Sequence, residues 1–379
     1  MIYLDNAATT PVPRAVADAM YQVLTEQFGN PSSQYPMGVE MKAAVERWRA
    51  VIAGALGCKA EQLYFTSCGT ESDNWAIQAA LWQNRHRGKH IITTAVEHSA
   101  VLEPCRWLAQ QGYEITYLKP GRDGNITVEQ VAAALREDTA LVSMMLVNNE
   151  TGYVFPVRET AALLREKNSP ALLHCDAVQG FMKVDCDPEG WGVDMMSLSA
   201  HKLGGPKGVG ALYISERFRM RNPRPLLPGG GQERGLRSGT EATAQIAGFA
   251  KAVELRQEHY EEKLAHMAAL KEYCRAKLLD MGGVVPVGSG TAPHILAVSL
   301  VGYPSGNIVT ELGAQGICIS AGSACHQGKA SHVVSALGLD KKTAAGVIRI
   351  SFSPDNTNED VDALCAALKA HRDSRFPML

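Results

Sequence analysis

Two neighbouring stretches, LLHCDAVQGF (172–181) and VDMMSLSAHKLGGPKGVGALYI (193–214), decide the fold that we predict for this chain. Each begins with an apolar run typical of a buried strand. Reactive side chains end both runs, Asp176 in the first and Ser199 and Lys202 in the second. Open α/β sheets bind ligands at the carboxyl ends of their strands. We therefore expect these strand ends to form part of a ligand site.

Similar apolar runs recur along residues 63–215, and helical segments separate most of them. The runs are LYFTS (63–67), HIITTA (90–95), EITYL (114–118), LVSMMLV (141–147), LLHCDA (172–177), MMSLS (195–199) and GALYIS (210–215). Alternation of this kind is typical of a mainly parallel sheet with helices on both faces. We predict an α/β fold in which a large domain, 13–252, contains this seven-stranded sheet.

A long amphipathic helix is predicted from about Ala252, and it opens a smaller α+β domain made of residues 1–12 and 253–379. Its predicted strands are ILAVSLV (295–301), ICISAG (317–322) and VIRISF (347–352). This domain would carry the cysteine-containing loop that follows the second of these strands.

Composition narrows the possible functions. The formal net charge of −2 gives no electrostatic reason to expect nucleic acid or an anionic membrane as a partner. No apolar run is long enough to span a bilayer, so we expect a soluble, cytoplasmic protein. The nine cysteines form no CxxC pair, which argues against a disulfide framework and against a metal site.

Lys202 and Asp176 together suggest pyridoxal 5'-phosphate (PLP) as cofactor. Partial burial lowers the pKa of a lysine, and a neutral amine forms Schiff bases. A buried carboxylate can keep the pyridine nitrogen of PLP protonated. The alternative is that Lys202 reaches solvent and Asp176 caps a helix.

Other strand ends carry polar groups as well. Gly69 and Thr70 open a helix whose backbone N–H groups can hold a phosphate, although an ordinary capped helix is equally consistent. His98 follows the next run, and Asn149 lies after a later one; a structural histidine and a simple turn are the alternatives. Five strand ends with polar groups at one sheet edge argue for a shared site.

Three further segments contain candidate residues. The glycine-rich stretch 229–240 ends in Thr240 and is either a flexible linker or another anion-binding turn. Cys325 lies in a run of small residues near His326 and Lys329, which would favour a reactive thiolate on an exposed loop. Arg349 is a cation in an apolar strand and needs an anionic partner, either a substrate carboxylate or a structural acid.

Taken together, the motifs resemble those of the bacterial cysteine desulfurases (NifS/IscS-like), in the class V aminotransferase branch of the fold-type I PLP enzymes. They are DNAATT (5–10), FGNPSS (28–33), TESDN (70–74), EHSAV (97–101), VNNETG (147–152), DAVQ (176–179), SAHKLGGPKGVGALY (199–213), GGGQERGLRSGT (229–240), GSAC (322–325) and IRIS (348–351). The resemblance covers nearly the whole chain, in the order of the family.

The resemblance implies a role for each site residue. Lys202 would hold PLP covalently, and Asp176 would pair with its pyridine nitrogen. Gln179 would hydrogen-bond its phenolic oxygen, and His98 would stack on the ring. The residues implied to bind the cofactor phosphate are Gly69, Thr70, Ser199, His201 and, from the second subunit of a homodimer, Thr240. The residues implied to bind the substrate carboxylate are Asn149, Arg349 and Asn30, with Asn149 also beside the cofactor.

The implied reaction converts L-cysteine to L-alanine and leaves sulfur on Cys325 as a persulfide for an acceptor protein. Lys202 would move the Cα proton. Iron–sulfur cluster assembly and tRNA thiolation are both possible destinations, because the segment after Cys325 is shorter than in the housekeeping members. Selenocysteine lyase, another class V PLP reaction, and a non-catalytic sulfur-relay partner are the alternative functions.

Overall fold

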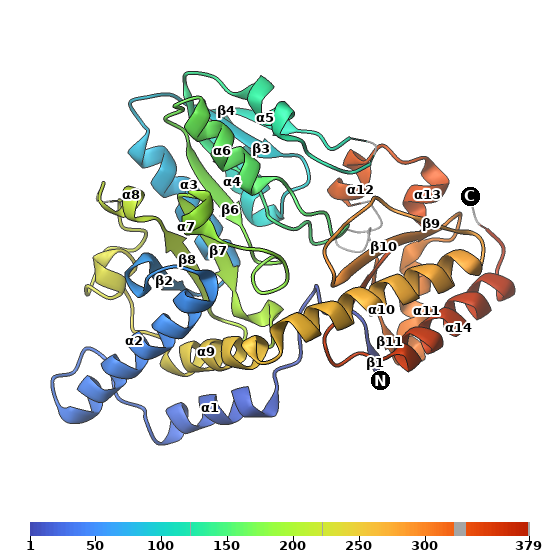
Figure 1. Cartoon of the computed structure of the whole chain (residues 1–379), viewed down its shortest axis with the longest axis horizontal. Coiled ribbons are helices and arrows are strands. Elements are labelled where there is room, and N and C mark those ends of the chain that lie inside the picture. The colour runs from blue at the N-terminus through green and yellow to red at the C-terminus, as the bar shows by residue number, and fades with distance from the viewer. Residues whose placement is uncertain (122, 222, 322–330, 378–379) are drawn as a thin grey trace.

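The computed structural model describes residues 1–121, 123–221, 223–321 and 331–377 (Figure 1). A large sheet lies at the centre of the bigger lobe, with strand order β2-β8-β7-β6-β5-β3-β4. Its strands are β2 (Leu63–Thr66), β3 (His90–Thr94), β4 (Glu114–Leu118), β5 (Thr139–Ser143), β6 (Leu172–Asp176), β7 (Met195–Ser199) and β8 (Gly210–Ile214). The predicted mainly parallel seven-stranded sheet is therefore confirmed. Only β8 runs antiparallel to its neighbours.

Helices cover both faces of this sheet. Its strands carry apolar side chains on both faces, which must be shielded from water. Consecutive strand residues such as Leu172 and Leu173 are both buried, and they belong to separate hydrophobic clusters. The helices of this lobe are α1 (Arg14–Thr25), α2 (Pro36–Leu56), α3 (Gly69–Gln83), α4 (Ser99–Gln110), α5 (Val128–Ala134), α6 (Val157–Glu166), α7 (Pro188–Trp191), α8 (Glu216–Arg219) and α9 (Thr243–Gln257). Helices α3 and α4 pack on one face and α1, α2 and α9 on the other.

The smaller lobe holds an antiparallel sheet, β12-β13-β10-β9, and a parallel pair, β1-β11. Its elements are β1 (Ile2–Tyr3), α10 (Tyr260–Asp280), β9 (Val284–Pro286), β10 (Ile295–Leu300), α11 (Ser305–Ala314), β11 (Ile317–Cys318), β12 (Ser320–Ala321), α12 (His332–Ala336), α13 (Lys341–Ala345), β13 (Val347–Ser351) and α14 (Asn358–Ser374). The N-terminal strand joins this lobe because Ile2 pairs with Ile317. An α+β arrangement was expected, but β9 was not.

Two expectations about element limits were wrong. The single helix predicted from Ala252 is two helices, α9 and α10, because the helix is interrupted at His259, which has a φ of 52°. Residues up to Val253 pack in the core of the large lobe, and Met267 packs in that of the small lobe. The domain limits at 252 and 253 therefore fall inside α9 and remain predictions. Of the run 141–147, only 141–143 form strand.

No helix among the described residues is long and apolar enough to cross a membrane. In the same part of the chain all eight cysteines are free thiols, and no cluster of side chains has the composition of a metal site.

Candidate active site

The polar strand ends meet at one edge of the large sheet. Strand β8 is antiparallel to both β2 and β7, so β2 runs in the same direction as β7, β6, β5 and β3. The carboxyl ends of these strands therefore bring together Thr70, His98, Asn149, Asp176 and Lys202, as the sequence predicted.

Lys202 lies in a short 3-10 turn, Ala200–Lys202, directly after β7. Its Nζ donates hydrogen bonds to the backbone carbonyl oxygens of Ala7 and Ala8, at 2.7 and 2.8 Å. Burial, with a smaller contribution from the charge of Arg349, lowers the pKa of this amine to about 8. A lysine with this pKa is partly neutral near physiological pH and can act as a nucleophile or a base.

Asp176 ends β6 and is 6% exposed. Its Oδ1 accepts a hydrogen bond from the backbone N–H of Val178 at 2.9 Å. Burial, together with the nearby carboxylate of Asp73, raises the pKa of Asp176 to about 7. A cationic ring nitrogen beside this carboxylate would restore its charge, since an opposite charge favours the ionised form.

His98 is the N-cap of α4, and its Nδ1 accepts a hydrogen bond from the backbone N–H of Ala100 at 3.1 Å. Because Nδ1 is an acceptor, a neutral ring carries its proton on Nε2. Burial lowers the pKa of His98. The imidazole is thus held neutral at the same sheet edge as Asp176, as a ring that stacks on a cationic cofactor requires.

The start of α3 has the form of a phosphate cradle. Cys68, its N-cap, provides no side-chain hydrogen bond to the helix, so the first N–H groups are not capped. The packing requires a glycine at position 69, because a Cβ there would lie 2.7 Å from Cγ2 of Val178. Ser199 is buried beside it. His201 bonds Thr9 Oγ1 through Nδ1 at 3.2 Å, and burial lowers its pKa to about 4.

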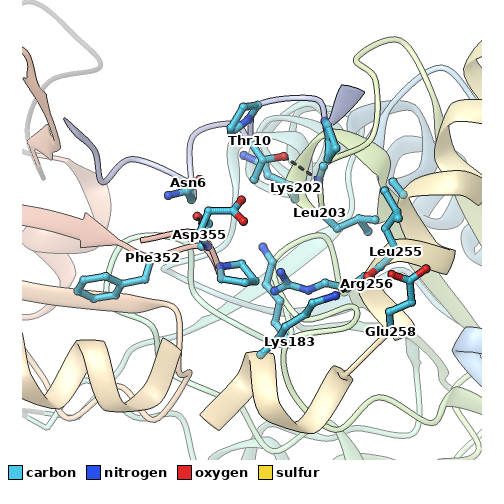
Figure 2. Close-up of a pocket in the computed structure, with 17 residues that line it drawn as sticks. Asn6, Thr10, Lys183, Lys202, Leu203, Leu255, Arg256, Glu258, Phe352 and Asp355 are labelled. Carbon is cyan, nitrogen blue, oxygen red and sulfur yellow. Dashed lines mark hydrogen bonds between the residues drawn. The ribbon is translucent and has the colours of Figure 1, made fainter. Parts of the chain in front are cut away.

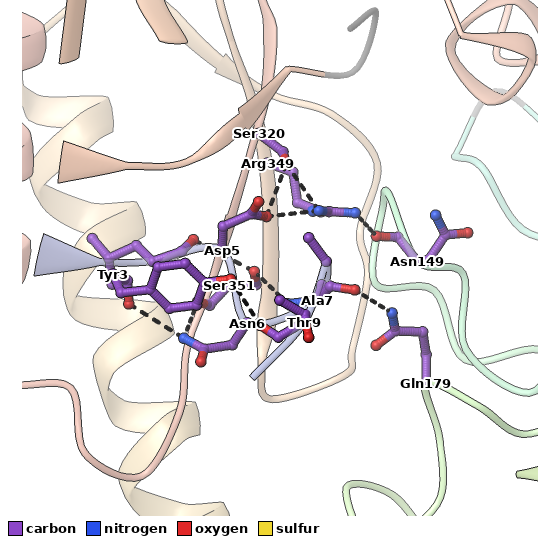
Figure 3. Close-up of polar contacts among 12 residues, drawn as sticks. Tyr3, Asp5, Asn6, Ala7, Thr9, Asn149, Gln179, Ser320, Arg349 and Ser351 are labelled. Carbon is purple, nitrogen blue, oxygen red and sulfur yellow. Dashed lines mark hydrogen bonds and ion pairs between the residues drawn. The ribbon is translucent and has the colours of Figure 1, made fainter. Parts of the chain in front are cut away.

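Arg349, in β13, is the cation of the small lobe at this site (Figure 3). Its Nη2 pairs with Asp5 Oδ1 at 2.7 Å and also donates to Ser320 Oγ at 3.0 Å. Its Nη1 donates to the backbone oxygen of Asn149 at 2.8 Å, while its buried Nε has no partner among the described residues. The structural acid considered from sequence is therefore present, and the arginine still has an unpaired donor.

The N-terminal segment connects the two lobes, which sequence reasoning missed. Ala7 O accepts hydrogen bonds from both Lys202 Nζ and Gln179 Nε2, at 2.7 Å each (Figure 3). Asp5 of the same segment holds Arg349. The motif DNAATT was noticed, but backbone carbonyls have no residue-type signal, so only the structure shows that this segment positions the site.

The segment 229–240 is anchored and is not a flexible linker. Glu233 is buried and forms two hydrogen bonds to Arg49, at 2.7 and 2.8 Å, and one to the backbone N–H of Phe65. Arg237 pairs with Glu71 in the first turn of α3 at 2.7 Å. Thr240 at the end of the segment is exposed.

Two groups of predicted residues are not placed at the site by the described part of the chain. Asn30 lies in the exposed loop between α1 and α2, where its Oδ1 accepts a hydrogen bond from the backbone of Ser32 at 2.9 Å. Cys325, His326 and Lys329 lie outside the described residues, between β12 and α12. The roles assigned to these residues and to Thr240 stay predictions.

A comparison with protein families identifies the chain. The profile described as "Aminotransferase class-V" matches residues 2–364. This chain belongs to the class-V aminotransferases. The family predicted from the motifs is thereby confirmed.

Curated relatives are similar over almost the full chain. A protein of Methanosarcina thermophila named "Cysteine desulfurase IscS" is 41% identical over 365 residues, which are 95% of this chain and 89% of the relative. "Cysteine desulfurase 2" of Trichormus variabilis is 42% identical over 367 residues, 96% of this chain and 90% of the relative.

Solved structures support the same fold. A "NifS-like protein" superposes with a TM-score of 0.92 at 36% identity, covering 99% of this chain and 100% of its own. A structure titled "SspA in complex with cysteine" has a TM-score of 0.81 at 33% identity, covering 94% of this chain and 100% of its own. The predicted fold class, a large α/β domain with a smaller α+β domain, agrees with these likenesses.

Proposed function

We propose that this chain is a PLP-dependent cysteine desulfurase that converts L-cysteine to L-alanine and passes the sulfur to an acceptor protein. The observation that carries the proposal is the pairing, at one sheet edge, of an amine with a lowered pKa, Lys202, with a buried carboxylate, Asp176. Curated relatives of similar length are named for this activity.

The residues present fit PLP. The uncapped N-terminus of α3 supplies N–H groups for a phosphate. Asp176 is a buried acid that needs a cationic partner, and Gln179 has its amide turned to the backbone of the N-terminal segment beside Lys202. Gly69, Thr70, Ser199 and His201 would hold the phosphate, and Asp176, Gln179, His98 and Lys202 the ring and aldehyde.

When bound, PLP supplies an electron sink for the charge that develops on the substrate Cα. Lys202 would take the Cα proton on Nζ, since its lowered pKa leaves a neutral amine available. Arg349 would bind the substrate carboxylate through its unpaired Nε and the neighbouring Nη groups, with Asn149 beside it. Asp176 would keep the cofactor nitrogen protonated by accepting its hydrogen bond.

Sulfur transfer would use Cys325, which lies in the motif GSAC. Its thiolate would attack the substrate Sγ and form an S–S bond, while the substrate Cβ–Sγ bond would break. The electron pair of that bond would stay with the three-carbon product, which takes up a proton on its way to alanine, and a persulfide would remain on Cys325. The loop position predicted from the sequence suits this role, because the same sulfur must reach the cofactor and afterwards an acceptor.

A homodimer is part of the proposal. Helices α1 and α2 and their connecting loop expose large apolar side chains at one end of the molecule (Figure 1). The exposed residues are Tyr21, Leu24, Phe28, Tyr35 and Val39. Several large apolar side chains exposed on neighbouring elements favour an interface. Thr240, exposed at the end of an anchored segment, would then complete the phosphate cradle of the second subunit.

The proposal is tested by incubating PLP-loaded protein with L-cysteine and quantifying alanine and persulfide. We expect alanine to form, and Lys202→Ala to abolish it. Cys325→Ser should abolish persulfide formation while PLP absorbance is retained. Cys318→Ala, which removes a free thiol of β11 in the same lobe, is the matched control and should keep the activity. Two results for the wild-type protein would contradict the proposal. One is alanine formation from selenocysteine but not from cysteine, and the other is a failure of borohydride to attach PLP covalently to Lys202.

A further inference from the structure

A cavity of about 240 Å³ lies between the two lobes and touches Lys202 (Figure 2). Its walls come from the N-terminal segment at Thr10, from the end of α9 at Arg256, and from the loop 352–355. Apart from Lys202, it is lined by none of the residues expected to hold PLP. The cavity therefore adjoins the expected cofactor cradle at Lys202, while the rest of its wall is distinct from that cradle.

Two cations line this cavity without a carboxylate partner. Lys183 is 4% exposed, and its Nζ has one hydrogen bond, a long one of 3.4 Å to Gln179 Oε1. Arg256 donates to Met182 O at 3.4 Å and to Met267 Sδ at 3.6 Å. Neither forms an ion pair within the part of the chain that the structure describes. Buried cations are normally paired with an anion. Without one, the transfer of the charge from water into the protein costs roughly several kcal/mol.

The surroundings of these two side chains are positive. Burial, followed by the charge of Arg256, lowers the pKa of Lys183 well below its usual value. His294 is buried with both ring nitrogens unpartnered, and its pKa is also lowered, by burial and then by Lys183 and Arg256. These mutual effects show that the cations lie close together, as Lys183 and Arg256 do in Figure 2.

The carboxylates at the cavity form no ion pair with Lys183 or Arg256 among the described residues, although the charge of Asp355 raises the pKa of Arg256 against the larger, lowering effect of burial. Glu258 and Asp355 line it, but both are exposed to solvent. Lys263 adds a further cation, with its Nζ bonded to the backbone oxygen of Leu255 at 2.6 Å. Water screens the two exposed acids, whereas Lys183 is shielded from it.

We propose that this cavity binds a small oxyanion, such as phosphate, sulfate or a short carboxylate, between Lys183 and Arg256. The cavity is far larger than the roughly 10–15 Å³ that one water needs, so an anion with part of its hydration fits. The planar fork of Arg256 suits two oxygens of one ligand, and the ammonium of Lys183 suits a third. The site is independent of the desulfurase proposal.

Calorimetry on the full-length, PLP-loaded protein tests this site. Inorganic phosphate, sulfate and acetate are titrated separately at constant ionic strength set with chloride. We expect saturable binding of at least one of the three, and a loss of about tenfold or more in affinity in Arg256→Met and in Lys183→Met, since each removes a charge-assisted hydrogen bond. Comparing the three probes distinguishes a tetrahedral oxyanion from a carboxylate.

Three further variants make the test specific. Arg256→Lys keeps the charge but loses the planar fork, so it should lose less affinity than Arg256→Met, which guards against a folding defect in the methionine variant. Asp355→Asn removes a carboxylate from the wall and should tighten binding. Lys251→Met removes a cation of the same helix that pairs with Glu254 outside the cavity, and should change nothing.

Three results would overturn the proposal. The first is the absence of saturable binding for all three anions. The second is an affinity that is the same in the wild type and in a folded Arg256→Met protein. The third is binding that occurs only in PLP-free protein, because that anion would occupy the cradle at Thr70.

Discussion

At the scale of single residues, burial is the largest influence on the reactive groups. It lowers the pKa of Lys202 to about 8 and raises that of Asp176 to about 7. Neighbouring charges act in second place: Arg349 repels the Lys202 ammonium, and Asp73 repels the Asp176 carboxylate. Strand ends at one sheet edge thus place an amine and an acid that both titrate near neutral pH.

The pKa of Lys202 predicts how cofactor loading depends on pH. Only the neutral amine attacks an aldehyde, and with a pKa of about 8 its fraction is about one hundredth at pH 6 and about one half at pH 8. The rate of PLP uptake by cofactor-free protein should therefore rise about tenfold per pH unit below pH 8 and level off above it. Stopped-flow absorbance measures this rate.

A lysine with the ordinary pKa would give a different profile, with the rate still rising at pH 9 and above. Borohydride reduction followed by peptide mapping assigns the signal to Lys202, and Lys202→Ala is the control. A rate independent of pH between 6 and 8 would contradict the lowered pKa.

Asp5 gives a second prediction at this scale. Its carboxylate neutralises Arg349 in a largely buried pair, with side-chain exposures of 17% and 10%. Asp5→Asn keeps an acceptor but leaves the arginine uncompensated, so we expect unfolding to become easier by about 1–2 kcal/mol. A substrate carboxylate would then supply the missing charge, and KM for cysteine should fall a few-fold, in steady-state assays.

Ser320→Ala is the matched control for Asp5→Asn. It removes a neutral hydroxyl that bonds the same Asp5 Oδ1 and Arg349 Nη2, at 2.8 and 3.0 Å, without changing the charge. Its KM should stay close to that of the wild type. An unchanged or higher KM in Asp5→Asn would show that the carboxylate orients Arg349 and does not compete with the substrate.

At the scale of elements, the segment 229–240 shows how buried charge orders a glycine-rich stretch. Glu233 and Arg234 both have positive φ values, 48° and 55°, which side chains rarely adopt. The ion pair of Glu233 with Arg49, together with its bond to Phe65 N–H in β2, holds this conformation. The segment therefore ends at a defined position, with Thr240 exposed.

Glu233→Gln should loosen this segment. The change leaves Arg49 buried without its anion, so we expect a loss of about 3 kcal/mol in the free energy of unfolding, measured by denaturant titration. Glu46→Gln removes an exposed partner of the same Arg49 and should cost less than about 1 kcal/mol. Similar losses in the two variants would mean that the buried pair is not the anchor.

At the scale of the whole molecule, the proposed dimer accounts for two features together, the exposed apolar side chains of α1 and α2 and the exposed Thr240. Within one chain no contact brings Thr240 to Ser199 or His201. A second copy would both cover the apolar side chains and supply this threonine, so assembly and phosphate binding are expected to be lost together.

Subunit complementation tests this arrangement. Lys202→Ala and Thr240→Val proteins should each have little activity, and mixing them under exchanging conditions should restore part of it. The mixed dimer contains one site with its own Lys202 and with the second subunit's intact Thr240. Alanine formation measures the recovery.

Mixtures of Lys202→Ala with Asp176→Ala provide the control, because each of these changes affects a residue expected to act within its own subunit. One intact site cannot form from that pair, so no recovery is expected. Recovery equal to that of the Thr240 mixture, or a monomer at all concentrations by sedimentation, would contradict the arrangement.

The sequence alone determined the strands, the sheet edge and most of the side chains gathered there. Apolar runs such as 172–177 are local signals, and parallel strands must place their carboxyl ends at one edge. The motifs around Lys202 and Asp176 were enough to predict the family. The spacing of apolar residues and the residue types in the motifs carry this information, and both can be read from a single sequence.

Only the tertiary structure decided which groups control those side chains. The bonds of Ala7 O to Lys202 and Gln179, and the pair of Asp5 with Arg349, join residues more than a hundred positions apart. Lys183 and Arg256 look ordinary in sequence, because their burial, and the lack of an ion pair to either among the described residues, arise only when the chain has folded around them. Local patterns encode strands and motifs, whereas the electrostatic environment of a residue depends on everything that packs around it.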